Sequence, residues 1–520
     1  MRTYFGSTNV RQNNDFGSFV PAFLFISTMT AVLFFLCRPV VFLYPKYDGV
    51  DKTLACVFFF SLGIVYVQAL GCFFSLLRFG RKNRRIPTLS PPAPLVTVFV
   101  ICDREAADVI ESTLIACYDL DYPEKSIWLL DCSAGDNPAV NDLSGRFKVR
   151  FFQSEVGEPQ YDFLNRAVES AETGYVALFA AGQDPISSFL KDTIPFMEAD
   201  RDLALVQSPQ LFSNLTSSPV AMAADFQRAV FYRCVCAGRG SEALAVSLTN
   251  MVLRRQEVLA AGGFDQCVSA LPMKLHARGS KTFYNDRVYT FCVGPDDIAG
   301  YFRQQYYWAV DAAEILKRMP LAVLTRARNF MPLRWLEYLM SGTHYLTGLA
   351  YIFLIACSVS YLVFRVPSFF MFSAVCLFAP APCLLLSLAV LYTGTFRRGY
   401  SVNDIIKAHF LYLITVPVAS RAYFYSFLGI ERADFVRRRL YAASFVRVVW
   451  PQLICWVVLL SAVTWRMNRF IRERSADVLI NLIWTAFHFI MFSGIFYFNE
   501  HQWRKSRDRI GIEGNEFDGK

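Results

Sequence analysis

Long apolar stretches near both ends of the chain enclose a less hydrophobic middle. Each stretch approaches the roughly 20 residues that a helix needs to cross the hydrocarbon core of a bilayer, and the pattern predicts about six spanning helices. The short polar loop PKYDGVDK joins the first two into a hairpin. The expected spans are Phe19–Tyr44, Leu54–Leu77, Tyr345–Phe364, Phe369–Tyr392, Trp450–Trp465 and Val478–Phe498.

One more apolar stretch, Ser401–Ile430, carries charged residues and a proline. These are Asp404, Lys407, Pro417 and Arg421. Charges inside a lipid-exposed helix are costly, so we expect this stretch to be an amphipathic segment at the membrane surface rather than another span.

In the middle of the chain, from about Val96 to Arg318, short strand-like runs alternate with helix-like ones. The expected strands are Leu95–Ile101, Ser126–Leu130 and Tyr175–Phe179, and the expected helices are Ala106–Cys117 and Tyr161–Ala171. This alternation predicts a mainly parallel sheet with helices on both faces. Ligands bind at the carboxyl ends of such strands, where Cys102 to Glu105, Asp131 and Ala180 to Gly182 fall.

Composition and charge fit a membrane protein with a folded soluble part, since 54% of the residues are hydrophobic. The net charge of +9 does not indicate nucleic acid, because much of it lies in clusters beside apolar runs, such as Arg78–Arg85. These clusters place the soluble part and both termini in the cytoplasm, against four arginines in the last outward loop. The 14 cysteines are scattered without a CxxC pair, which is typical of small buried residues in a reducing compartment.

The stretch Gly174–Pro185 carries the most informative sequence, GYVALFAAGQDP. Enzymes that transfer a sugar from a nucleotide diphosphate hold Mg²⁺ or Mn²⁺ with two carboxylates, spaced one residue apart, at the end of such a strand. Here the three positions are Ala180, Ala181 and Gly182, none of which can bind a metal. We interpret the later Asp184 as a turn residue rather than a substitute ligand.

The order of segments resembles the processive membrane glycosyltransferases of family 2, which include bacterial cellulose synthase, hyaluronan synthase and related exopolysaccharide synthases. The resemblance extends from about Val96 to Arg509, and four motifs carry it: LALVQSPQLFSN at Leu203–Asn214, NMVLRRQEVLAAGGF at Asn250–Phe264, MKLHARG at Met273–Gly279 and YFRQQYYWAV at Tyr301–Val310. It implies an α/β domain of the GT-A type in the cytoplasm, joined to a multi-span α-helical transmembrane region.

The resemblance and the hydrophobic pattern together imply a division of the chain. We expect a cytoplasmic tail at 1–18, two transmembrane helices at 19–77, a basic and proline-rich linker at 78–95, the GT-A-like domain at 96–318, an amphipathic interface segment at 319–343, two transmembrane helices at 344–393, an interface helix with a degenerate gating segment at 394–443, two transmembrane helices at 444–498 and a cytoplasmic tail at 499–520. The gating segment would fall on Phe435–Leu440, where three arginines replace the threonine and lysine of the family.

Two acids stand where the family contacts the nucleotide. Glu105 ends CDRE, where the family has an Asn-Glu pair, and Asp131 matches the first acid of an Asp pair whose second position is Cys132. For Glu105, a nucleotide contact and a solvated acid at a helix start are equally good interpretations. For Asp131, a nucleotide contact is favoured over a simple turn residue.

The Gln-x-x-Arg-Trp motif of the family is only partly present. Gln304 and Trp308 match it, while Tyr307 replaces the arginine and removes a positive charge from the diphosphate site. We expect Gln304, Tyr307 and Trp308 to hold an acceptor or glycan, because aromatic faces bind the apolar faces of sugars. The alternative is that these aromatic residues pack the domain against the membrane interface.

The general base and a phosphate-facing lysine are also replaced. The Thr-Glu-Asp segment of the family falls on Gln266, Cys267 and Val268, with Asp265 displaced by one residue, and QYDFLN at Gln160–Asn165 lacks the lysine. Three other basic residues have a structural interpretation, and for two of them a functional alternative stays open. We expect His276 to pack or cap a helix, and Arg254 and Arg255 either to form an interface pair or to bind phosphate.

The replaced groups all serve one reaction, so we hypothesise a catalytically degenerate glycosyltransferase with no catalytic and no metal-binding residue. It would partner an active synthase in exopolysaccharide synthesis or secretion. The alternatives are an active but divergent nucleotide-sugar transferase, the one case in which Mg²⁺ or Mn²⁺ is expected, and a non-enzymatic membrane scaffold. The expected partners are the lipid bilayer of a bacterial inner membrane, other polysaccharide subunits, and a nucleotide sugar or glycan, but no nucleic acid.

Overall fold

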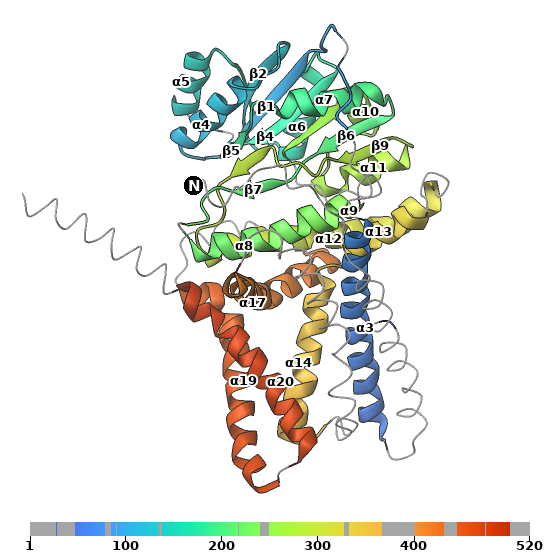
Figure 1. Cartoon of the computed structure of the whole chain (residues 1–520), viewed down its shortest axis with the longest axis vertical. Helices are drawn as coiled ribbons and strands as arrows, with labels where there is room; N and C mark the ends of the chain where they lie inside the picture. Colours follow the sequence, from blue (N-terminus) through green and yellow to red (C-terminus); the bar gives the residue numbers. More distant parts are fainter. Residues whose placement is uncertain are drawn as a thin grey trace, which may run out of the picture.

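The computed structural model describes residues 47–366 and 401–499, apart from 79–84, 90, 134, 136–137, 217, 240–248, 327–331, 431–444 and 474, together with residue 28. An α/β domain lies at one end of an elongated molecule, and four long helices extend from the other end (Figure 1). These helices are α3 (Gly49–Arg78), α14 (Leu346–Phe364), α19 (Phe445–Glu473) and α20 (Ala476–Phe492).

Seven strands form the main sheet, in the order β3-β2-β1-β4-β8-β6-β9. Their bounds are β1 Val96–Cys102, β2 Lys125–Asp131, β3 Arg150–Gln153, β4 Tyr175–Ala180, β6 Leu203–Gln207, β8 Met251–Arg254 and β9 Lys281–Tyr284. All pairs are parallel except those of β8, which runs antiparallel to both β4 and β6. The prediction of a mainly parallel sheet is confirmed. The strands β3, β6, β8 and β9 were not among the predicted ones, and the reversed direction of β8 was not predicted either.

Apolar runs bury both faces of this sheet. All seven residues of β1 are buried, and alternate side chains enter two cores, as expected for parallel strands covered on both sides. Val98 and its neighbours pack with α4 (Ala107–Tyr118), α5 (Pro138–Phe147) and α7 (Phe189–Ala199). Phe99 and its neighbours pack with α6 (Gln160–Ser170), α10 (Arg255–Ala260) and α11 (Leu271–Ala277). The two helices predicted in this region are therefore confirmed as α4 and α6.

A small second sheet lies between the main sheet and the membrane-side helices (Figure 1). It has the order β5-β10-β7, with β5 at Gln183–Pro185, β7 at Gln210–Phe212 and β10 at Thr290–Cys292. Because β5 follows β4 directly, this small sheet holds the turn that leaves the ligand edge of the main sheet.

Several helices lie crosswise between the α/β domain and the long helices (Figure 1). They are α8 (Pro219–Val230), which continues into the π-helix η1 (Phe231–Cys236) and α9 (Ala237–Arg239), then α12 (Ile298–Arg326), α13 (Pro332–Gly342) and α17 (Val402–Phe427). Helix α12 runs without a break across residue 318, where we expected the soluble domain to end.

Among the described residues, five helices are long and apolar enough to cross a membrane: Gly49–Ser75, Leu346–Phe364, Val402–Phe427, Val446–Asn468 and Ala476–Asn499. Four of these match predicted spans. The predicted spans at 19–44 and 369–392 and the gating segment at 435–440 lie outside the described residues.

Helix α17 meets the length and composition of a span although we expected it at the membrane surface. Asp404 lies in a capping box with Ser401, so this charge is at the helix end and leaves an apolar window behind it. Figure 1 shows α17 crosswise to α14, and the surface position of this segment stays a prediction.

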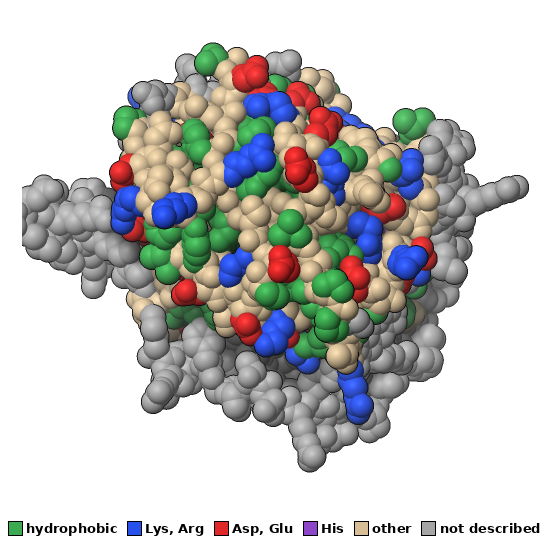
Figure 2. Space-filling view, turned by 90° about the horizontal axis from the view of Figure 1, so that it is seen from above, with side chains coloured by type: hydrophobic (Ala, Val, Ile, Leu, Met, Phe, Trp, Pro, Cys, Tyr) green, Lys and Arg blue, Asp and Glu red, His purple; other side chains and the backbone are tan. Residues whose placement is uncertain are grey.

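Seen from above, the face of the α/β domain remote from the long helices carries Lys and Arg interspersed with Asp and Glu (Figure 2). No single sign of charge dominates this face.

Candidate functional site

The carboxyl ends of β1, β2 and β4 meet at one edge of the main sheet. Cys102 is in register with Asp131, and Ile101 is in register with Ala180. Parallel pairing thus brings together the three loop starts that the sequence analysis placed at the ligand edge.

The turn at Ala180–Gly182 is held by neutral groups. The Ala180 amide donates to Gln183 Oε1 at 3.0 Å, the Ala181 amide to the Ile101 carbonyl at 2.8 Å, and the Gly182 amide to Thr113 Oγ1 at 2.9 Å. Gly182 has a φ of +83°, which suits glycine. The turn therefore presents two methyl groups and a glycine where the resemblance implies metal-binding carboxylates.

A buried network of uncharged side chains lies behind this turn. Gln183 Nε2 donates to Gln210 Oε1 and to Thr249 Oγ1, both at 2.8 Å. Asn250, with a φ of +62°, donates to the Ser208 carbonyl at 2.6 Å. Sequence reasoning missed these residues, because amides and hydroxyls at strand ends carry no charge signal.

Asp184 points toward α4 rather than toward the turn. Ser112 Oγ on α4 donates to Asp184 Oδ1 at 3.4 Å, and burial raises the pKa of the carboxyl group. Asp184 lies in strand β5, in register with Phe291 of β10. The interpretation of Asp184 as a turn residue is therefore wrong.

The two expected nucleotide contacts differ in exposure. Asp131 is fully buried; its Oδ1 accepts from the Ser133 amide at 2.9 Å, and its Oδ2 has no hydrogen-bond partner among the described residues. Glu105 is exposed, and its Oε2 accepts from the Asp103 amide at 2.5 Å. Asp131 thus has one carboxylate oxygen that accepts no hydrogen bond from the described residues, whereas the Glu105 carboxylate is bonded to the backbone of its own turn.

Two cysteines next to these acids are poor ligands and nucleophiles. Burial, followed by the charge of Asp131, raises the pKa of Cys102 far above its usual value. Burial, followed by the charge of Asp103, raises the pKa of Cys132 to about 12. Both thiols stay protonated at neutral pH, and the thiolate is the reactive form.

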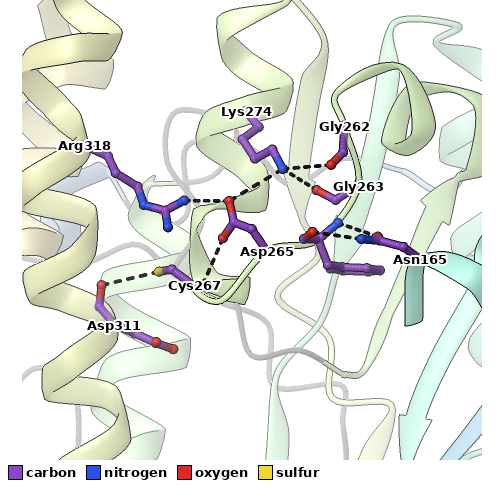
Figure 3. A network of polar contacts seen from close by, with 9 residues as sticks. Asn165, Gly262, Gly263, Asp265, Cys267, Lys274, Asp311 and Arg318 are labelled. Atoms are coloured by element: carbon purple, nitrogen blue, oxygen red, sulfur yellow. Dashed lines mark hydrogen bonds and ion pairs between the residues drawn. The ribbon is translucent and has the colours of Figure 1, made fainter. Parts of the chain in front are cut away.

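Asp265, the acid nearest to the expected base position, is held in ion pairs (Figure 3). Its Oδ2 lies 2.6 Å from Arg318 Nη1 and 3.6 Å from Lys274 Nζ, and its Oδ1 accepts from the Cys267 amide at 2.9 Å. Both carboxylate oxygens of Asp265 are therefore engaged by neighbouring groups of the protein.

The loop that carries Asp265 is also fastened from the other side (Figure 3). Asn165 on α6 exchanges two hydrogen bonds with the backbone of Phe264, at 2.9 and 2.7 Å. Gly263 has a φ of +64°, and a Cβ there would overlap Asn165. Cys267, at the position of the glutamate of the family motif, is 1% exposed and donates to the Asp311 carbonyl at 3.7 Å.

The expected glycan contacts lie on α12. Gln304 Oε1 is buried without a hydrogen-bond partner among the described residues, Tyr307 is 38% exposed, and Trp308 is half-buried. The Arg228 guanidinium from α8 lies 5.9 Å from the Trp308 ring centre and 4.3 Å from that of Phe212. The cation beside this motif therefore comes from another helix, which the sequence did not reveal.

The other basic candidates are structural. Arg254 donates to the Leu203 carbonyl at 3.1 Å and to Tyr175 Oη at 2.9 Å, and Arg255 donates to the Val168 carbonyl at 2.8 Å. These contacts lie at the opposite edge of the sheet. His276 lies between Tyr338 Oη at 2.7 Å and Thr282 Oγ1 at 2.9 Å, which confirms the packing interpretation. Among the described residues, no three His, Cys, Asp or Glu side chains are grouped to hold a metal ion.

Strand order and crosswise helices define a GT-A-like mixed α/β domain joined to a multi-pass membrane region. Residues 187–394 match the family model "Glycosyl transferase family group 2". These findings make the chain a membrane protein related to the family 2 glycosyltransferases that include cellulose synthase and poly-N-acetylglucosamine synthase.

Three relatives illustrate this relationship. A UDP-forming cellulose synthase catalytic subunit of Dictyostelium discoideum is 32% identical over 157 residues, which cover 29% of this chain and 15% of that protein. The UDP-forming cellulose synthase catalytic subunit of Pseudomonas fluorescens is 23% identical over 476 residues, 84% of this chain and 61% of that protein. Poly-beta-1,6-N-acetyl-D-glucosamine synthase of Staphylococcus epidermidis is 21% identical over 281 residues, 51% of this chain and 64% of that protein.

The chain thus spans less than two thirds of the length of each of these relatives. Among solved structures, a mannosyltransferase from Pyrobaculum calidifontis in complex with GDP-Man and Mn²⁺ is 16% identical, with a TM-score of 0.46, covering 74% of this chain and 99% of that one.

Proposed function

We propose that this protein is a cellulose synthase-like membrane subunit of polysaccharide synthesis or secretion whose catalytic centre no longer supports sugar transfer. It would sit in a bacterial inner membrane, with its α/β domain in the cytoplasm, beside an active synthase. The observation that carries the proposal is the neutral turn at Ala180–Gly182, whose amides are bound by Gln183, Ile101 and Thr113.

The chemistry of sugar transfer explains why this turn matters. A departing nucleoside diphosphate gains negative charge, which a metal ion and cationic side chains stabilise. Neither the turn nor Tyr307 supplies such a charge. Loss of one electrostatic or acid–base group typically costs about 10² to 10⁴ in rate, so the combined losses leave little chemical catalysis.

The state of Asp265 supports the same conclusion. An acceptor hydroxyl needs a carboxylate that can take its proton. Asp265 instead accepts from Arg318 and the Cys267 amide and lies near Lys274. These contacts give it a structural role in joining its loop to α12.

A second candidate is an active but divergent transferase. Asp131 favours it, because the buried Oδ2 atom has no hydrogen-bond partner among the described residues and lies at the ligand edge. In that case Asp131 would contact the donor, and Mg²⁺ or Mn²⁺ would be required.

Turnover by the purified full chain in lipid nanodiscs separates these candidates. UDP-glucose, UDP-N-acetylglucosamine and GDP-mannose are each offered with Mg²⁺ or Mn²⁺, and release of nucleoside diphosphate is measured beside a working cellulose synthase. We expect release no greater than that from empty nanodiscs. Saturable, metal-dependent release that is lost in Asp131→Asn would reject the proposal.

Cross-linking in native membranes tests the proposed partnership. We expect a synthase with an intact metal-binding Asp pair, or another polysaccharide subunit, among the cross-linked proteins. A chain that binds neither nucleotide nor glycan and cross-links to no such protein would instead fit a plain membrane scaffold.

A further inference from the structure

The ligand edge at the ends of β1 and β2 carries an excess of negative charge. Asp103 and Glu105 follow β1 directly, and Asp131 ends β2 in register with Cys102. Arg104 is the one cation in the turn after β1; it is exposed and has a φ of +71°. Three acidic side chains against one guanidinium give this edge a formal net charge of about −2.

The negative charge at this edge also affects the pKa of its two thiols, Cys102 and Cys132. After burial, the carboxylates of Asp131, Glu105 and Asp103 each raise the pKa of Cys102. After burial, the same three carboxylates also raise the pKa of Cys132. The Cys132 amide donates to the Cys102 carbonyl at 2.8 Å, and Cys102 is in register with Asp131. The segments that carry the three acids are therefore adjacent.

The other cations considered for the site are engaged elsewhere. Arg254 and Arg255 bind carbonyl groups at the opposite edge of the sheet, and Arg318 pairs with Asp265. Arg228 is 6% exposed and stacks on Phe212. Among the described residues, no three His, Cys, Asp or Glu side chains are grouped to hold a metal ion that would offset this charge.

Asp131 adds a second, independent feature. Its side chain is 0% exposed, and Oδ2 has no hydrogen-bond partner in the part of the chain that the structure describes. A buried carboxylate oxygen without a partner is costly, and a ligand N–H or O–H would satisfy it. The imide of a pyrimidine base and the hydroxyls of ribose are such donors.

We propose that this edge binds the nucleoside part of a nucleotide and discriminates against its diphosphate, so that uridine binds more tightly than UDP. The inference rests on the proposed function and goes further by reversing the ligand preference expected of a metal-dependent transferase. Mg²⁺ does not restore the affinity for UDP, because the turn at Ala180–Gly182 carries no carboxylate that would hold the ion against the diphosphate.

The expected difference follows from Coulomb repulsion. Two excess negative charges within about 8 Å of a diphosphate, in a partly solvated site, weaken its binding by about tenfold. Salt screens charges over a Debye length of about 10 Å at 0.1 M. Raising NaCl from about 50 mM to about 500 mM should therefore narrow the gap between uridine and UDP.

The test is ligand-observed NMR and calorimetry on the full chain in nanodiscs, with uridine, UMP and UDP, each with and without Mg²⁺. We expect affinity to fall in that order and to be unchanged by Mg²⁺. Asp131→Asn should weaken uridine binding by about tenfold, because it replaces the carboxylate acceptor that the base or ribose would use.

Charge variants supply the sign of the effect. Glu105→Gln keeps an acceptor for the Asp103 amide and should strengthen UDP binding about threefold relative to uridine binding. Arg104→Gln should weaken UDP binding by a similar factor. The matched control is Glu124→Gln, an exposed acid next to the opposite end of β2, which should change neither ligand.

Tighter binding of UDP than of uridine, with or without Mg²⁺, would overturn the inference, and so would a failure of uridine to bind. The affinity measurements and the test of the proposed function can fail independently of each other. If UDP with Mg²⁺ binds best and no sugar is transferred, the degenerate-subunit proposal stands and the nucleoside preference falls. If sugar is transferred, the proposed function falls, and the affinity order is still decided by the same titrations.

Discussion

At the scale of single residues, Asp265 shows how an acid near a lost catalytic position can become structural. Its carboxylate joins the loop after Gly263 to α12 through Arg318 at 2.6 Å. About a third of each side chain is exposed, 31% for Asp265 and 32% for Arg318. We expect Asp265→Asn to lower the free energy of unfolding by about 1 kcal/mol, after allowing for solvent screening.

Thermal unfolding of the full chain in nanodiscs, followed by tryptophan fluorescence, measures this change. The matched control is Asp200→Asn, whose partner Lys281 is 49% exposed and lies at 3.1 Å; it should cost less than about 0.5 kcal/mol. Equal effects of the two substitutions would show that Asp265 has no special structural role.

His276 gives a second prediction at this scale. Burial, followed by the charge of Arg334, lowers its pKa from 6.5 to about 3. The unfolded chain therefore takes up a proton below about pH 6.5, while the folded chain stays neutral there. The contribution of His276 to stability is complete above about pH 6.5 and is lost as the pH falls toward about 3, at up to about 1.4 kcal/mol per pH unit.

The measurement is the melting temperature of the wild-type chain and of His276→Gln between about pH 7.5 and about pH 4.5, a window that spans the titration of an ordinary histidine. The variant loses stability at all pH values, because contacts to Tyr338 and Thr282 are broken. Its melting temperature should nevertheless depend less on pH. Parallel pH profiles for the two proteins would contradict the lowered pKa.

At the scale of elements, Glu337 on α13 joins the long helix α3 to the crosswise helix α9. Its Oε1 lies 2.8 Å from Arg78 of α3, and its Oε2 lies 2.8 Å from Arg239 Nε of α9, an ion-pair distance without hydrogen-bond geometry. The Glu337 side chain is 8% exposed. A Cβ at Gly238 would overlap the Ser75 carbonyl of α3, so the helices are in backbone contact.

Glu337→Gln leaves two arginines without their counter-charge, one of them buried, and should cost about 3 kcal/mol. Arg78→Gln should cost less, because Arg239 keeps its partner and Arg78 is 26% exposed. Hydrogen exchange in α13 and α9 reports the loosening. If hydrogen exchange is unchanged in Glu337→Gln, the ion pairs of Glu337 do not contribute to holding α3, α9 and α13 together.

An element could be predicted from the sequence where a single physical property, such as continuous hydrophobicity, determines its structure. Strand β1 was predictable, because a continuous apolar run that is buried on both faces has few other solutions. The surface position of α17 was predicted from charges, yet Asp404 serves as a helix cap, and the remaining window is as apolar as a span. Charges at a helix end do not report what the middle of the helix packs against.

The candidate site could be predicted only at positions where the residue type alone determines the chemistry, such as the ability to bind a metal. Ala180 to Gly182 could be recognised, since neither methyl groups nor glycine can bind a metal. The role of Arg228 beside Trp308 could not, because that contact joins helices 80 positions apart in sequence, and no local pattern signals it. The same is true of Arg318, which reaches Asp265 from α12.

At the scale of the whole molecule, orientation in the membrane follows from where charge is placed. The cluster at 78–85 predicts that the α/β domain faces the cytoplasm, and the connection between α19 and α20 then lies outside. Arg365 and Asp477 pair at 2.9 Å near this outer connection.

We expect Ser475→Cys, at the start of α20, to react with a membrane-impermeant maleimide added to intact cells. An engineered cysteine at Glu124 should react only after the membrane is permeabilised, and the parent chain corrects for its native cysteines. If Glu124→Cys is labelled in intact cells and Ser475→Cys is not, the orientation is inverted, and a cytoplasmic nucleotide cannot be the ligand of this domain.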